Sequence, residues 1–61
     1  MRSFKLVLES SDGTKIWINL AHMLKMEQEP DGKYYLYLIN GERYLISHST
    51  ARFVENYFEG R

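Results

Sequence analysis

Three short segments that end in glycine punctuate the first 48 residues: Ser11-Asp12-Gly13, Pro30-Asp31-Gly32 and Asn40-Gly41. Asp-Gly and Asn-Gly pairs favour tight hairpin turns because glycine readily adopts the left-handed backbone conformation that such turns require. Each segment lies between runs of residues that favour β-strands. We therefore expect these 48 residues to form a five-stranded antiparallel meander.

The alternation of apolar residues selects the first loop. A two-residue Asp12-Gly13 turn would mix the apolar and polar faces of the two flanking strands, whereas a three-residue loop with Gly13 in the bulge position keeps them apart. We therefore expect the three-residue loop. It pairs Leu8 with Ile16, Leu6 with Ile18 and Phe4 with Leu20 on one face, and Glu9 with Lys15 and Val7 with Trp17 on the other.

The same reasoning sets the faces of the next two hairpins. A three-residue loop at Pro30-Asp31-Gly32 pairs Met26 with Leu36 and Leu24 with Leu38, and a two-residue turn at Asn40-Gly41 pairs Leu36 with Leu45 and Tyr37 with Tyr44. The expected inner face then consists of Leu24, Met26, Leu36, Leu38 and Leu45. The opposite face consists of Tyr35, Tyr37, Ile39, Tyr44 and Ile46.

Two segments depart from the strand pattern. Residues 19–23 lack alternation, which is typical of one helical turn opened by Asn19 or of a bulged corner. After His48 the pattern is helical, with Ser49 as the expected N-cap and Gly60 as the end. The apolar stripe of this helix is Phe53, Val54, Tyr57 and Phe58. A helix this short must dock to persist, and we expect it to cover the leucine-rich face of the sheet.

The fold predicted for the chain is therefore an α+β domain. It has a five-stranded antiparallel meander and one C-terminal helix within a single small domain of residues 1–61. The sheet either stays open or curls into a small barrel.

The aromatic face of this sheet is the most informative feature for function, because monomeric proteins rarely leave a large apolar patch in water. Three explanations stay open: the rings are core of a small barrel, the face mediates homo-oligomerisation, or it binds another molecule. A 61-residue chain without cysteine gains little from its own core, which favours association. The expected interaction surface comprises Trp17, Tyr35, Tyr37, Tyr44 and Ile46, with Lys5 and Lys25 beside them.

Charge argues against a protein that acts mainly by coating nucleic acid. Eight basic residues balance eight acidic ones, whereas phosphate binding needs a basic excess. Nucleic-acid binding is therefore kept as the less favoured alternative, with stacking on the aromatic residues and contacts from Lys5 and Lys25. No apolar run is long enough for a signal peptide or a membrane span, so we expect no membrane insertion and a cytoplasmic location.

No catalytic residues are expected. The two histidines, His22 and His48, do not lie at ligand spacing from another histidine, and cysteine is absent, so neither a metal nor another cofactor is predicted. His48 lies between Ser47 and Ser49, but a nucleophile pair there would lack a third member and a glycine-supported elbow. We predict a non-enzymatic protein.

The order of these elements resembles the small flagellar-operon FlbD/SwrD family along nearly the whole chain. The matching residues are Asp12-Gly13, Asn19, Pro30-Asp31, Leu38, Asn40-Gly41, Tyr44 and Ser49. The segment from Ala21 to Met26 is less acidic and less rich in isoleucine than in that family, and the helix from Arg52 to Phe58 is less rich in valine, isoleucine and glutamate. A second, partial resemblance is to LytTR-type DNA-binding domains, which need a longer chain.

The first resemblance implies a bacterial protein that acts in motility by contacting other proteins. We therefore predict a protein-interaction module or small bacterial regulator that acts through the aromatic face, with itself and another protein as partners. The alternatives are a nucleic-acid-binding regulator and a phage or mobile-element protein that inhibits a host factor.

Overall fold

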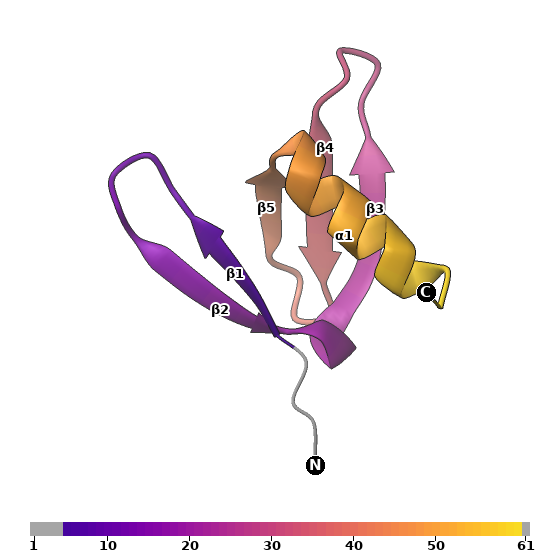
Figure 1. Ribbon diagram of the computed structural model, residues 1–61, viewed down its shortest axis with the longest axis horizontal. Coiled ribbons are helices and arrows are strands. Elements are labelled where there is room, and N and C mark those ends of the chain that lie inside the picture. The colour runs from indigo at the N-terminus through magenta and orange to yellow at the C-terminus, as the bar shows by residue number, and fades with distance from the viewer. Residues whose placement is uncertain (1–4, 61) are drawn as a thin grey trace.

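The computed structural model describes residues 5–60 and confirms an α+β fold with five antiparallel strands and one C-terminal helix (Figure 1). The strands are β1 (Lys5–Glu9), β2 (Lys15–Asn19), β3 (Met23–Gln28), β4 (Tyr34–Leu38) and β5 (Arg43–Ile46). A single 3₁₀ turn, η1 (Leu20–His22), joins β2 to β3, and the helix is α1 (His48–Phe58).

The strands form two separate sheets, so the prediction of a single meander is wrong. β1 pairs with β2 alone, β3, β4 and β5 form a three-stranded sheet, and the described strands do not close into a barrel. The division occurs at η1, where the Asn19 side chain accepts a hydrogen bond from the Ala21 N–H at 3.0 Å and caps the turn. This confirms the predicted helical turn at Asn19. The hairpin consequently diverges from the three-stranded sheet (Figure 1).

All three hairpin loops have the same construction. The N–H of the residue before each loop bonds to the carbonyl of the residue after it, in the pairs Ser10 with Thr14, Glu29 with Lys33 and Leu38 with Glu42. In each loop the middle side chain, Asp12, Asp31 or Asn40, accepts a backbone N–H two residues later at 3.0 Å. The glycine that follows it has a φ of 91°, 92° or 93°, a conformation that other residues rarely adopt.

The third loop is therefore Ile39-Asn40-Gly41, and the two-residue turn predicted there is wrong. The extra residue shifts β5 by one position, so that Leu36 lies opposite Tyr44 and Tyr37 opposite Arg43. The predicted pairings of Leu36 with Leu45 and of Tyr37 with Tyr44 are both incorrect. Because successive strand residues face opposite sides, this shift exchanges the two faces of β5.

The exchange moves Tyr44 and Ile46 to the core side. Ile46 is buried, Tyr44 is half-buried against the core, and Leu45 is 58% exposed on the other face.

A bulge changes the register of β3 as well. Met23 lies opposite Leu38, the next paired position is Lys25 opposite Tyr37, and Leu24 falls between them. Leu24 is therefore exposed rather than in the core, and its predicted pairing with Leu38 is wrong. The predicted pairing of Met26 with Leu36 is confirmed.

The first hairpin has the predicted register. Leu6 lies opposite Ile18, Leu8 opposite Ile16, Val7 opposite Trp17, and Glu9 opposite Lys15. The predicted partnership of Phe4 with Leu20 involves a residue outside the described range.

Helix α1 begins two residues earlier than predicted. Its N-cap is Ser47 rather than Ser49, because the Ser47 hydroxyl accepts the Thr50 N–H at 3.2 Å. Of the predicted apolar stripe, Val54 is buried, whereas Phe53, Tyr57 and Phe58 are each more than one-third exposed. The helix ends at Phe58, before Gly60.

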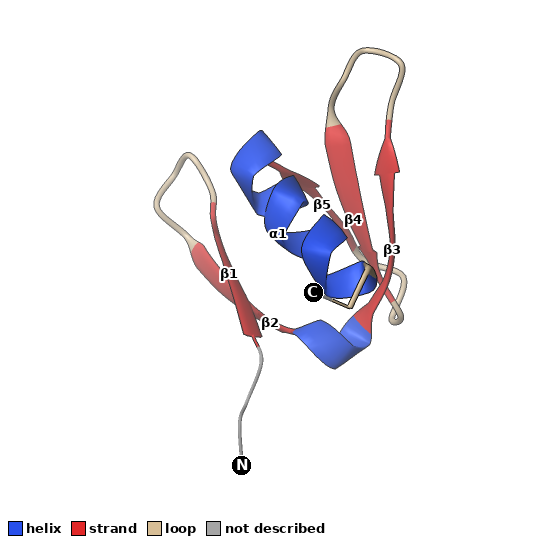
Figure 2. Cartoon of the chain, turned by 45° about the vertical axis from the view of Figure 1, so that its right-hand side comes forward, coloured by secondary structure: helices blue, strands red, loops and turns tan. Residues whose placement is uncertain are grey.

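Helix α1 lies between the hairpin and the three-stranded sheet (Figure 2). The sequence prediction that it covers the leucine-rich face holds for Leu36 and Leu38. The buried core consists of Leu6, Ile18, Leu20, Met23, Leu36, Leu38, Ile46, Ala51 and Val54.

The first loop gives a prediction about pH. A hydrogen bond from the Ser10 hydroxyl, followed by one from the Thr14 N–H, lowers the pKa of Asp12 from 3.8 to about 2. Because the folded pKa is the lower one, the ionised carboxylate stabilises the loop above pH 3.8, and this contribution is lost as the pH falls toward 2. We expect a carboxyl titration followed by NMR to give a midpoint near 2 for Asp12. A midpoint near 3.8 would show that these hydrogen bonds do not persist in solution.

Candidate functional site

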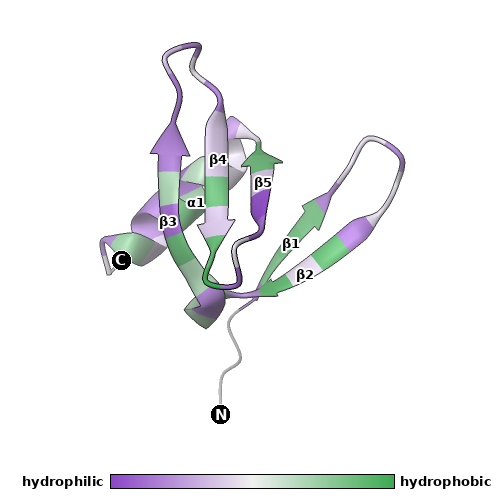
Figure 3. Cartoon of the chain, turned by 180° about the vertical axis from the view of Figure 1, so that it is seen from behind, coloured by the Kyte–Doolittle hydropathy of each residue, from purple (hydrophilic) through white to green (hydrophobic). Residues whose placement is uncertain are grey.

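The structure divides the predicted interaction surface among three places. Trp17 and Lys5 lie on the outward face of the β1–β2 hairpin. Tyr35, Tyr37 and Lys25 lie on the face of the three-stranded sheet opposite to the one that carries the buried Leu36. Figure 3 views the sheet from the side away from α1. Tyr44 and Ile46, the remaining two residues, lie on the opposite face of that sheet, where Ile46 is buried in the core and Tyr44 is half-buried against it.

We call the outer side of the three-stranded sheet the tyrosine face. Two cross-strand rows make it up. One row runs from Lys25 through Tyr37 to Arg43, and the other from Glu27 through Tyr35 to Leu45. Each row has a tyrosine on the central strand, flanked by one residue from each outer strand.

Cationic groups lie over both tyrosine rings. The Lys25 ammonium is 4.8 Å from the centroid of the Tyr37 ring, and the Arg43 guanidinium carbon is 5.0 Å from the centroid of the Tyr35 ring. Both distances are within the range of a cation–π interaction. The contact of Lys25 with Tyr37 lies within one row and joins β3 to β4. The contact of Arg43 with Tyr35 runs from one row to the other and joins β5 to β4, so the two contacts connect all three strands.

Lys25 also forms an ion pair with Glu27, with 2.8 Å between Nζ and Oε2. Glu27 raises the pKa of Lys25, and the Lys25 ammonium, followed by the Tyr37 hydroxyl, lowers the pKa of Glu27. Because both side chains are about half exposed, water screens this pair and it adds little to the stability of the fold.

Arg43 differs from Lys25 in its partners. Its pKa is raised chiefly by the Tyr37 side chain, with further contributions from Tyr35 and from the charge of Glu29. No carboxylate of the described residues, however, lies within salt-bridge distance of Arg43. A planar guanidinium is thus held against an aromatic ring and keeps its capacity to bind a carboxylate.

Sequence reasoning missed Arg43 and Leu45 as members of this surface. The missing information was the register of β5, which places Arg43 and Leu45 beside the tyrosines. One signal in the sequence could have indicated this register. Ile39-Asn40-Gly41 has the same pattern as the two preceding loops, a residue followed by Asp or Asn and then Gly, which favours a third three-residue loop.

A cleft of about 350 Å³ separates β2 from β5 and the loop before it. Trp17, which is 62% exposed, and Ile39 contribute apolar surface to this cleft, and Tyr44 lies at its wall. The Tyr44 hydroxyl donates to Glu42 at 3.0 Å, and this hydrogen bond raises the pKa of Tyr44. Asn19, His22 and Asn40 supply the polar rim.

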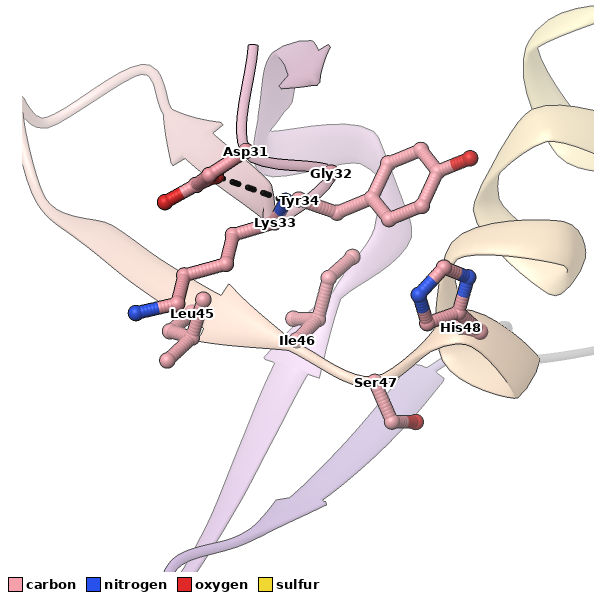
Figure 4. A pocket seen from close by; sticks show the side chains of 8 residues that line it. All are labelled: Asp31, Gly32, Lys33, Tyr34, Leu45, Ile46, Ser47 and His48. Carbon is pink, nitrogen blue, oxygen red and sulfur yellow. Dashed lines mark hydrogen bonds between the residues drawn. The ribbon is translucent and has the colours of Figure 1, made fainter. Parts of the chain in front are cut away.

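A second, open cleft of about 410 Å³ lies where the β3–β4 loop approaches the start of α1 (Figure 4). The ring of Tyr34 points toward His48, and the two rings meet edge to face with 5.3 Å between centroids and 86° between planes. Opposite them, the Lys33 N–H donates to the Asp31 carboxylate at 3.0 Å. The contacts in this cleft are those of a loop packed beside a helix end.

The described residues show no arrangement of titratable groups that points to chemistry. Residues 5–60 contain no group of three or more histidine, aspartate or glutamate side chains placed to hold a metal ion. They contain no buried polar or charged side chain, and both histidines are exposed. Within the same range, no helix has the length and apolar character needed to cross a membrane.

No family model matches the chain, and no curated protein and no solved structure shows significant similarity to it.

Proposed function

We propose that this protein is a non-enzymatic protein-interaction module that binds its partner on the tyrosine face. The observation that carries the proposal is Arg43, which stacks on Tyr35 without an ion-pair partner among residues 5–60 and has the exposed Leu45 beside it. Arginine and tyrosine are enriched among the residues that contribute most to binding at protein interfaces.

The charges on this face indicate what the partner presents. Lys25 is neutralised by Glu27, so Arg43 is the cation that a partner carboxylate can pair with. Leu45 is exposed on the same face as Arg43 and favours an apolar side chain beside that carboxylate. The partner we propose is a protein surface that carries an acidic side chain within an apolar patch.

This function is compatible with the motility regulator that the sequence resemblance suggests and with a phage protein that inhibits a host factor. Both stay predictions, as does the cytoplasmic location. Nucleic-acid binding is less favoured on the tyrosine face, because Glu27 and the chain's zero net charge oppose phosphate binding.

The test uses a partner isolated with the immobilised wild-type chain, identified and then purified. We expect Arg43→Glu to weaken its affinity, measured by isothermal titration calorimetry, by at least about tenfold, or 1.4 kcal/mol. Tyr35→Ser should have a similar effect because it removes the support of the guanidinium. The matched control is Lys15→Glu, the same charge reversal on the hairpin, which should leave affinity unchanged.

Equal affinity of the wild type and Arg43→Glu would contradict the proposal. Salt-sensitive binding to single-stranded oligonucleotides that Arg43→Glu abolishes would instead support the nucleic-acid alternative.

A further inference from the structure

Strand β1 has an unpaired edge. Hydrogen-bonded and non-hydrogen-bonded pairs alternate along an antiparallel hairpin. Because the Ser10 N–H donates to the Thr14 carbonyl, the pairs of Leu8 with Ile16 and of Leu6 with Ile18 are also hydrogen-bonded. The N–H and C=O groups of Lys5, Val7 and Glu9 therefore point away from β2. No other described strand pairs with that edge. Such an edge is a template for pairing with another strand.

The sequence of β1, Lys5-Leu6-Val7-Leu8-Glu9, is complementary to itself when it is read in the opposite direction. If two copies pair antiparallel with Val7 opposite Val7, then Lys5 of each copy lies opposite Glu9 of the other, and Leu6 lies opposite Leu8. This is also a register in which the free backbone groups of the two edges meet. Pairing centred on Lys5 or on Glu9 would instead place like charges opposite each other.

We infer that two copies of this protein associate through β1 in this register, around a two-fold axis that passes beside Val7. The two hairpins then form one four-stranded sheet with the order β2, β1, β1 and β2. The occupant of the β1 edge is thus a second copy of the chain. The association is separate from the proposed partner binding, because it uses the hairpin and not the tyrosine face.

The outward face of this four-stranded sheet gains an apolar centre with charged margins. Val7 and Trp17, which are 47% and 62% exposed, lie opposite each other in the hairpin. Across the two copies they form a continuous row with Trp17 at each end and the two Val7 side chains in the middle. A charged row lies on each side of this apolar row. In each charged row, Glu9 of one copy lies between Lys15 of the same copy and Lys5 of the other copy, so the charges alternate in sign.

The inward face gains apolar contacts as well. The added strand brings Leu6 and Leu8 of the second copy to the side of the hairpin on which α1 lies (Figure 2). Phe53 and Tyr57 remain 46% and 39% exposed on α1, so apolar surface is available on that side. A second copy therefore supplies burial that a chain this small lacks on its own.

Charge reversal tests the association and its register together. Sedimentation equilibrium of the wild type should show a monomer–dimer equilibrium, whereas Lys5→Glu and Glu9→Lys should each shift it to monomer by placing like charges opposite each other. An equimolar mixture of the two variants should recover the dimer, because each reversed charge then meets an opposite charge. Circular dichroism should show all three proteins folded.

A cysteine scan tests the register itself, because the natural chain has no cysteine. Opposed Val7 residues would have Cα atoms about 5.5 Å apart, within the range of a disulfide, so Val7→Cys should oxidise to a covalent dimer. Lys5→Cys should not, because its two copies would lie about 14 Å apart along the strands. A mixture of Lys5→Cys and Glu9→Cys should form the mixed dimer.

A wild type that stays monomeric at millimolar concentration would overturn the inference. Equal oxidation of Val7→Cys and Lys5→Cys would overturn the register, and so would failure of the mixed charge variants to recover the dimer. None of these results depends on Arg43, so they leave the proposed partner binding to its own test.

Discussion

Replacement of Leu36 by alanine is expected to remove a large part of the free energy of unfolding at 25 °C. Leu36 is fully buried at the centre of the three-stranded sheet, between Met26 on β3 and Tyr44 on β5. Truncation of a buried leucine costs about 2–5 kcal/mol. A chain of this length is typically stable by only about 3–9 kcal/mol, so one truncation removes much of the total.

Leu24→Ala is the matched control in the same sheet. Leu24 is the bulged residue of β3 and is 59% exposed, so its truncation should change the free energy of unfolding by no more than about 0.5 kcal/mol. Urea unfolding followed by the fluorescence of Trp17, the one tryptophan, measures both variants. Similar losses in the two variants would place Leu24 in the core and contradict the bulge.

The second large effect is expected at adjacent positions of β5. Ile46→Ala should cost about 2–5 kcal/mol because Ile46 is buried against the core, whereas Leu45→Ala should be nearly neutral because Leu45 is exposed. The same unfolding experiment compares the two variants. The two-residue turn at Asn40-Gly41 would give the opposite order, with Leu45 the sensitive position.

A reversed order would therefore remove Leu45 from the tyrosine face and return Ile46 to it. It would also weaken the proposed function, which needs Arg43 and Leu45 on the same side as Tyr35.

The sequence was sufficient for the parts of the fold in which pattern and turn agree. In the first hairpin, apolar residues alternate cleanly on both strands, so only a three-residue loop keeps Leu6 and Ile18 on one face. The capped turn after Asn19 was predictable for a similar reason, because the Asn side chain supplies its own hydrogen bond.

The third hairpin was not predictable from alternation. In β4, leucine alternates with tyrosine, and in β5 the residues Tyr44, Leu45 and Ile46 follow one another, so either register buries an apolar set and the hydrophobic pattern does not decide between them. Asn-Gly fits both a two-residue turn and the last two positions of a three-residue loop. The repeated hydrogen bond from the residue after glycine to Asp12, Asp31 or Asn40 resolves the choice only in three dimensions.

The other differences have local causes. Met23 and Leu24 are adjacent apolar residues, and either one could face the core until the bulge selects Met23. Ser47 and Ser49 are both good caps, and the helix starts at the one that receives the Thr50 N–H. The shift of β5 also changed the membership of the candidate surface, because it places Tyr44 and Ile46, two of the predicted members, on the opposite face of the sheet.

The tyrosine face exists only if β5 pairs with β4 in the register that places Arg43 and Leu45 beside Tyr37 and Tyr35. Leu38 and Glu42 form a hydrogen-bonded pair, so Tyr35 and Leu45 form a non-hydrogen-bonded pair in which the α-protons approach closely. A nuclear Overhauser effect between the α-protons of Leu45 and Tyr35 is therefore the most direct test. We expect that cross-peak to be strong. A strong cross-peak from Leu45 to Leu36 instead would show the two-residue turn and would remove Arg43 and Leu45 from the tyrosine face.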